Sequence, residues 1–92
     1  MKTLRKVETI PVYVDVIPDI MEQDKIYISQ KYRTASHLCL CDCGREVITP
    51  LTNRGWELTE LSDGKITISP SIGNFQSCNT HYIIIKNIAN FV

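Results

Sequence analysis

The sequence predicts a mostly β fold, a small antiparallel meander or open barrel with little helix that is stapled by zinc. Short runs in which apolar and polar residues alternate recur along the chain and are separated by turn residues, a pattern typical of strands. Asp63-Gly64 stands between two such runs, which is a strong hairpin signal. The number of runs indicates about six or seven strands, and we expect residues 1–92 to form a single domain.

Length and charge limit the classes of function. A chain of 92 residues buries a modest core, so a metal or disulfides would help to stabilise it. Ten basic and ten acidic residues cancel, and no basic stripe is present, which argues against a nucleic-acid partner. Neither a secretory leader nor an apolar run of about 18 residues is visible, so we expect a cytoplasmic protein without a membrane partner. Cysteines in that reducing compartment more often bind metal than pair with each other.

The first third of the chain predicts two strands. Alternation over residues 7–16 indicates the first, and Pro18 ends it. Residues 19–24 are polar enough for a turn or one helical turn, and residues 25–29 alternate again as the second strand. We expect residues 30–36 to be a polar connection.

The next stretch holds most of the cysteines. Residues 37–41 alternate strictly and predict a strand with the cysteines on one face and the leucines on the other. Asp42 and Gly44 tolerate positive φ, so the chain can turn tightly around Cys43. Apolar residues at 47 and 48 then predict a short strand that Pro50 ends.

The second half is strand-rich. Residues 55–61 and 65–69 predict the two arms of the Asp-Gly hairpin, and Trp56 is expected to pack in the core. Residues 69–74 have the composition of a loop. The continuous apolar run at 82–85 predicts a strand through the centre of a sheet, and residues 87–92 a last short strand.

Two separated segments contain the candidate ligands of one metal site, which we expect to hold zinc. Structural zinc takes four tetrahedral ligands, commonly as two closely spaced pairs. The turn favours Cys41 and Cys43 as one pair, and Cys78 with His81 forms the other in a C-x-x-H spacing. A set in which Cys39 replaces His81 remains open. Because strand residues four apart lie about 13 Å apart, Cys39 and Cys43 can share an ion only if the chain curls.

His37 stands two residues before the first cysteine. It can hydrogen-bond to a metal ligand without binding the metal itself, act as a catalytic base, or be a hydrogen-bonded polar residue at a strand start. Buried histidines are usually of the last kind, which we expect here.

The ordered motifs resemble the bacterial domain-of-unknown-function family 6527. That family's pattern is a strand-like Leu-Tyr-(Val/Ile)-Ser, then His-Leu-Cys-Pro-Cys-Gly-Cys-Gly, a tryptophan-containing hairpin, Pro-Ser-(Ile/Val), and a closing Cys-x-Ser-His. This chain departs from it at Leu40, at Asp42, which can still adopt a left-handed turn, and at Thr80. The match covers nearly the whole chain in order: residues 26–29, 37–44, 56, 70–74 and 78–82.

The resemblance implies a role in bacterial ubiquitin-like conjugation. Its members are encoded with ubiquitin-like proteins and with E1-like or E2-like enzymes, which are therefore the expected partners. One hypothesis is a peptidase that processes or removes the ubiquitin-like modifier. The other is a non-catalytic, zinc-stapled module that docks a ubiquitin-like protein or its conjugating enzymes through an exposed strand edge.

The peptidase hypothesis needs a nucleophile, a base and oxyanion donors. Ser71 is the candidate nucleophile, followed by two residues whose amides can face a reacting carbonyl, and His81 is the candidate base if it is not a ligand. A second version uses zinc as the Lewis acid and needs a carboxylate such as Glu46 or Glu57 nearby. Thiolate-rich zinc sites are usually closed, which disfavours that version.

Overall fold

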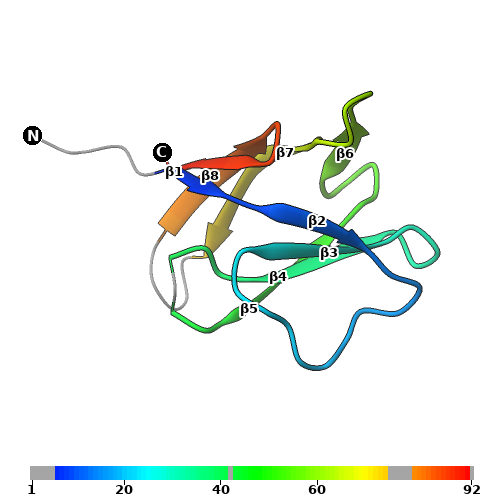
Figure 1. Cartoon of the computed structure of the whole chain (residues 1–92), viewed down its shortest axis with the longest axis horizontal. Helices are drawn as coiled ribbons and strands as arrows, with labels where there is room; N and C mark the ends of the chain where they lie inside the picture. The colour runs from blue at the N-terminus through cyan, green and yellow to red at the C-terminus, as the bar shows by residue number, and fades with distance from the viewer. Residues whose placement is uncertain (1–5, 42, 75–79, 92) are drawn as a thin grey trace, which may run out of the picture.

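The chain folds into two β-sheets. The computed structural model describes residues 6–41, 43–74 and 80–91, and within them every regular element is a strand (Figure 1). The mostly β class with little helix is therefore confirmed, but the described residues form more strands than predicted and no closed barrel. No helix in this part of the chain is long and apolar enough to cross a membrane.

Sheet order brings the two ends of the described chain together. The five-stranded sheet has the order β1 (Lys6–Glu8), β9 (Ile88–Phe91), β8 (Thr80–Ile85), β7 (Ile66–Asn74) and β6 (Glu57–Glu60). The four-stranded sheet has the order β2 (Ile10–Tyr13), β3 (Lys25–Ser29), β4 (Thr34–Leu38) and β5 (Glu46–Pro50). All pairings are antiparallel except β2 with β3.

The predicted first strand is divided between the sheets. The chain passes from β1 in one sheet directly into β2 in the other, as the blue segment of Figure 1 shows. Thr9 lies at this corner, where its amide and its hydroxyl both donate to the carbonyl of Asn87, at 2.7 and 2.8 Å. Strands that change sheets at such corners join two packed sheets into one core.

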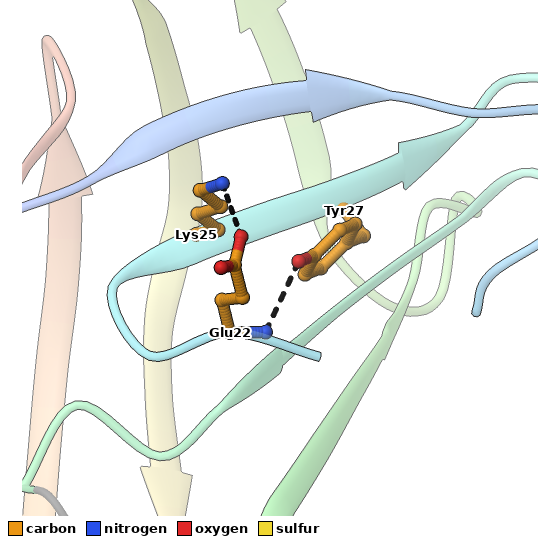
Figure 2. Close-up of polar contacts among 3 residues, drawn as sticks. All are labelled: Glu22, Lys25 and Tyr27. Atoms are coloured by element: carbon orange, nitrogen blue, oxygen red, sulfur yellow. Dashed lines mark hydrogen bonds and ion pairs between the residues drawn. The ribbon is translucent and has the colours of Figure 1, made fainter. Parts of the chain in front are cut away.

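An irregular connection, residues 14–24, joins the parallel strands β2 and β3. It contains no helical turn, and its final part is fixed by three side chains (Figure 2). The amide of Glu22 donates to the hydroxyl of Tyr27 at 3.0 Å, and the carboxylate of Glu22 pairs with Lys25. These contacts hold the polar segment against β3, so the connection needs no regular structure of its own.

The hairpin of β3 and β4 corrects one boundary. Residues 34–36 were expected in a polar connection, but they open β4 and pair with β3. The turn is completed earlier because Arg33 adopts a left-handed backbone, φ 51°. The hydroxyl of Thr49 donates to the carbonyl of Ala35 at 2.8 Å, so polar residues fit this buried part of the sheet.

The hairpin around Asp63-Gly64 is confirmed, with β6 and β7 antiparallel and Gly64 at φ 86°. The loop predicted at residues 69–74 is wrong, since β7 continues through them. A bulge makes this possible: Ile68 faces Ile84 and Ile72 faces Tyr82, so β7 advances four residues (72 − 68) while β8 spans two (84 − 82). Pro70 lies inside the bulge, where its missing N–H costs no ladder hydrogen bond.

β8 occupies the centre of the five-stranded sheet, as predicted, but only one of its faces is fully buried. Ile84 is inaccessible, whereas Ile85 is 43% exposed. The predicted last strand is confirmed as β9. It follows a two-residue turn in which Lys86 and Asn87 both have positive φ, as a type I′ hairpin requires.

The core lies between the two sheets. It is built mainly from isoleucines of β3, β7 and β8, and burial of each side chain of this size contributes about 1.5–3 kcal/mol. Its fully or nearly fully buried apolar members are Ile26, Ile28, Ala35, Cys39, Leu40, Ile66, Ile68, Ile72, Tyr82, Ile84 and Ala89. Trp56 packs against this cluster, in agreement with the prediction.

Asn87 offers a test of the corner between the sheets. Its side-chain oxygen accepts the buried amide of Ile66 at 2.8 Å, and its φ is 69°. We expect Asn87→Ala to lower the free energy of unfolding by about 2–4 kcal/mol, since it orphans that amide and strains the left-handed backbone. Asn87→Gly should lose less free energy of unfolding than the alanine variant, because glycine adopts the left-handed backbone without strain. Asn87→Asp should lose least, because it keeps the acceptor oxygen. Urea denaturation followed by circular dichroism measures all three, and equal stability of the alanine and aspartate variants would contradict this assignment.

Candidate active site and metal centre

The bulge in β7 brings Ser71 against His81 of β8. Ile72 and Tyr82 are buried, so the residues that alternate with them, Ser71, Gly73 and His81, lie on the opposite face of the sheet. Ser71 Oγ is 2.7 Å from His81 Nε2, and both residues are half-buried. Because the bulge adds two residues, it changes which side chains meet while Ile68 and Ile72 both stay in the core.

Trp56 fixes the backbone beside Ser71. Its indole Nε1–H donates to the carbonyl of Ser71 at 3.3 Å, and its own amide donates to Pro50. A groove of about 510 Å³ opens next to this contact. Its lining combines apolar and polar side chains with one carboxylate: Leu51, Thr52, Asn53, Gly55, Trp56, Glu57, Leu58, Ser69 and Pro70.

The amides after Ser71 belong to a strand, which limits the expected oxyanion donors. Consecutive N–H groups of a strand point to opposite edges, so Ile72 and Gly73 cannot both face one carbonyl. The Ser71 carbonyl points towards Trp56, away from β8. In the same alternation the N–H of Gly73 points to that outer edge, and the N–H of Ile72 points towards β8.

Three cysteines gather beside Thr80, which precedes His81 in β8 and projects to the opposite face of the sheet. The sulfurs of Cys39, Cys41 and Cys43 all lie within 4.8 Å of one another, and those of Cys39 and Cys41 are 3.3 Å apart. Cys39 Sγ is also 3.6 Å from the hydroxyl of Thr80, at the start of β8. The predicted ligand Cys78 and the turn residue Asp42 lie outside the described residues.

The chain curls here, which corrects the strand predicted over residues 37–41. β4 ends at Leu38, and Cys39 and Leu40 are both buried, which a strand with one core face does not allow. The amide of Cys39 donates to the carbonyl of Arg45 at 2.7 Å, and Gly44 has φ 83° as expected. This turn lets Cys39 and Cys43 approach each other.

The donor set fits a soft or borderline metal ion. Thiolates bind zinc at about 2.3 Å, and sulfurs on such a tetrahedron lie roughly 3.8 Å apart. The separations between the three sulfurs are compatible with that arrangement after small side-chain adjustments. Glu46 and Glu57, the carboxylates considered for Lewis-acid catalysis, are exposed and do not belong to this group.

His37 lies deep in the core, in the middle of β4 and not at a strand start. Its Nε2 is 2.7 Å from the hydroxyl of Tyr82, and its Nδ1 has no hydrogen-bond partner among the described residues. Burial lowers the pKa of His37 to about 4, so the ring is neutral at physiological pH. Its ring is directed to Tyr82, and the histidine that meets Ser71 is His81.

Tyr82 joins His37 to the cysteine turn. The amide of Leu40 donates to its hydroxyl at 3.5 Å, and burial, followed by the charge of Cys39, raises its pKa. If Tyr82 O–H donates towards the Cys39 sulfur, His37 donates its Nε2–H to Tyr82, and Nδ1 is then the nitrogen without a proton. This network therefore contacts the cysteine turn at Leu40, between Cys39 and Cys41.

Comparison with known proteins assigns this chain to a family. Residues 13–92 match the family model described as bacterial ubiquitination-like system serine protease, BubE. The chain belongs to this family. The match confirms the tie to bacterial ubiquitin-like systems that the resemblance implied. No curated protein and no solved structure matches the chain.

Several contacts of the site were missed by sequence reasoning. Trp56 was assigned to the core alone, yet it also binds the Ser71 backbone, and Tyr82 was read only as part of an apolar strand. No signal in the sequence pairs these residues. Pro70 is the one available clue to the bulge, because a proline inside a strand marks a place where the ladder is interrupted.

Tyr82→Phe tests the buried network. Loss of the hydroxyl leaves His37 without its hydrogen bond in the core, so we expect a loss of about 1–3 kcal/mol. For a domain of this size the midpoint of thermal unfolding should fall by roughly 4–8 °C per kcal/mol. The matched control is Tyr32→Phe, whose side chain is exposed and whose effect should stay within about 0.5 kcal/mol. Similar midpoints for both variants would rule out a structural role for the network.

Proposed function

We propose that this chain is a serine peptidase that cleaves the peptide bond at the C-terminal tail of a ubiquitin-like protein, and so processes the modifier or removes it. Ser71 is the nucleophile and His81 is the general base. The observation that carries this assignment is the 2.7 Å separation of Ser71 Oγ and His81 Nε2. The family, whose described activity is that of a serine protease, supports it.

The pair can carry out both halves of acyl transfer. With its proton on Nδ1, His81 accepts the Ser71 proton at Nε2 as Oγ attacks the carbonyl carbon. His81 then gives that proton to the leaving amine, the C–N bond breaks, and an ester on Ser71 remains. Water attacks the ester, His81 takes up its proton, and Ser71 regains a proton as the acid product leaves.

The oxyanion that forms during each step needs a donor. The N–H of Gly73 is the best-placed strand amide, because it points to the same edge as the Ser71 carbonyl and is two residues from the nucleophile. The Ile72 amide is directed towards β8 and cannot share this role. Trp56 positions the Ser71 backbone through its indole hydrogen bond.

We assign zinc to a structural site held by four thiolates, those of Cys39, Cys41, Cys43 and Cys78. The proximity of the first three sulfurs supports this set. The hydroxyl of Thr80 contacts Cys39, and Cys78 lies two residues before Thr80 in the sequence. Zinc bound there would staple the cysteine turn to the start of β8 and leave His81 available as a base. Thiolate ligation also suits the reducing cytoplasm.

Covalent labelling tests the nucleophile without any knowledge of the substrate. A fluorophosphonate probe should modify the purified protein at Ser71, and Ser71→Ala should abolish labelling. His81→Asn should slow labelling by about 10²–10⁴-fold, as expected when a general base is lost. Ser69→Ala, a substitution in the same strand and on the same face, is the control and should label normally. Labelling that survives in Ser71→Ala would disprove the assignment.

Cleavage separates the peptidase from the alternative binding module. The substrate is the ubiquitin-like protein of the same bacterial system, extended at its C-terminus by a reporter peptide. We expect wild-type protein to release the reporter and Ser71→Ala to bind without release. Binding by the wild type with no release would favour the non-catalytic docking module and overturn the peptidase.

Metal analysis decides between the two ligand sets. Purified protein should contain about one zinc per chain after dialysis, measured by plasma mass spectrometry. Cys39→Ser should lose most of it, whereas His81→Asn should retain it. The opposite result, zinc lost from His81→Asn and kept by Cys39→Ser, would place His81 in the metal shell and remove it as the base.

A further inference from the structure

Next to Ser71, the outer edge of β7 is paired with no strand among the described residues. β6 pairs with β7 only from Ile66 to Ser69. Beyond Ser69, none of the described strands pairs with this edge, so residues 71–74 form the border of the five-stranded sheet.

Main-chain groups of residues 71 and 73 point to this edge. The Ser71 carbonyl on it is taken by Trp56, and the next residue in the alternation, Gly73, carries both an N–H and a C=O in that direction. Edge strands with unpaired groups readily accept an added strand from another chain. At this border Gly73, the residue that would pair with an added strand, lies two residues from the proposed nucleophile, Ser71.

Gly73 places no side chain on the face that carries Ser71 and His81. It lies opposite His81 and on the same side of the sheet as Ser71. Any side chain at this position would project beside the Ser71–His81 pair. A glycine there allows a substrate backbone to approach the serine closely.

We propose that the substrate tail is bound as an added β-strand along residues 71–74 of β7, and that it runs on into the groove beside Trp56. One tail N–H donates to the Gly73 carbonyl, while the Gly73 N–H serves the reacting carbonyl. This inference rests on the proposed function and specifies its substrate: an extended, unstructured C-terminal tail of a ubiquitin-like protein, read mainly through its backbone. Glu57 is the one charged side chain in the groove lining, so neutral or basic tail residues are preferred there over acidic ones.

The test uses synthetic peptides of the tail of the ubiquitin-like protein from the same system, each joined to a fluorogenic amide and each N-methylated at one position. Because the Ser71 carbonyl is taken by Trp56, one tail N–H should pair with this edge, at Gly73. N-methylation should therefore lower kcat/KM about tenfold at that one residue and little at its neighbours. Equal rates along the series, with the unmethylated peptide still cleaved, would overturn the added strand and leave the peptidase intact. Failure of the fluorophosphonate to label Ser71 would instead overturn the proposed function.

Groove variants provide an independent readout. Asn53→Trp places a bulky side chain in the groove at an exposed position away from Ser71 and should raise KM for the tail peptide while fluorophosphonate labelling stays unchanged. Ser62→Trp, in the exposed turn of the β6–β7 hairpin, is the matched control and should leave both unchanged. An unaltered KM in Asn53→Trp would exclude the groove as the path of the tail.

Discussion

The bulge between Ile68 and Ile72 determines both the packing of the five-stranded sheet and the positions of Ser71 and His81. Because it inserts an even number of residues, Ile68 and Ile72 stay in the core while the strand is displaced along β8. The same displacement sets Ser71 against His81. Core packing and site geometry therefore depend on one local irregularity, which explains why a proline can occupy the middle of a structural strand.

The start of β8 has different chemistry on its two faces. On one face His81 meets Ser71, and on the other the neighbouring residue Thr80 contacts the thiol of Cys39. Since β8 is bordered on both sides and supplies both His81 and Thr80, a staple at its start would also restrict the movement of the base. Stability and positioning are thus connected through one strand.

Local signals in the sequence predicted a good part of this structure. Asp63-Gly64 identified the β6–β7 hairpin, and the alternation at residues 25–29 identified β3. The clustering of cysteines in the sequence identified the three whose sulfurs lie together. The failures concern long-range pairing: nothing local indicates that β1 joins β9, that β2 runs parallel to β3, or that Ser71 lies in a strand. Such pairings depend on which edges remain uncovered once the core forms, and a single sequence does not encode them as a periodicity.

The indole contact has a practical consequence. Trp56 is the sole tryptophan of the chain, and its N–H is bound to the carbonyl of the residue proposed as nucleophile. Indole emission is sensitive to exactly this kind of hydrogen bond and to the polarity of the adjoining groove. The protein thus carries an intrinsic optical sensor beside Ser71, so that the proposed acylation and tail exchange can be followed in real time without an attached dye.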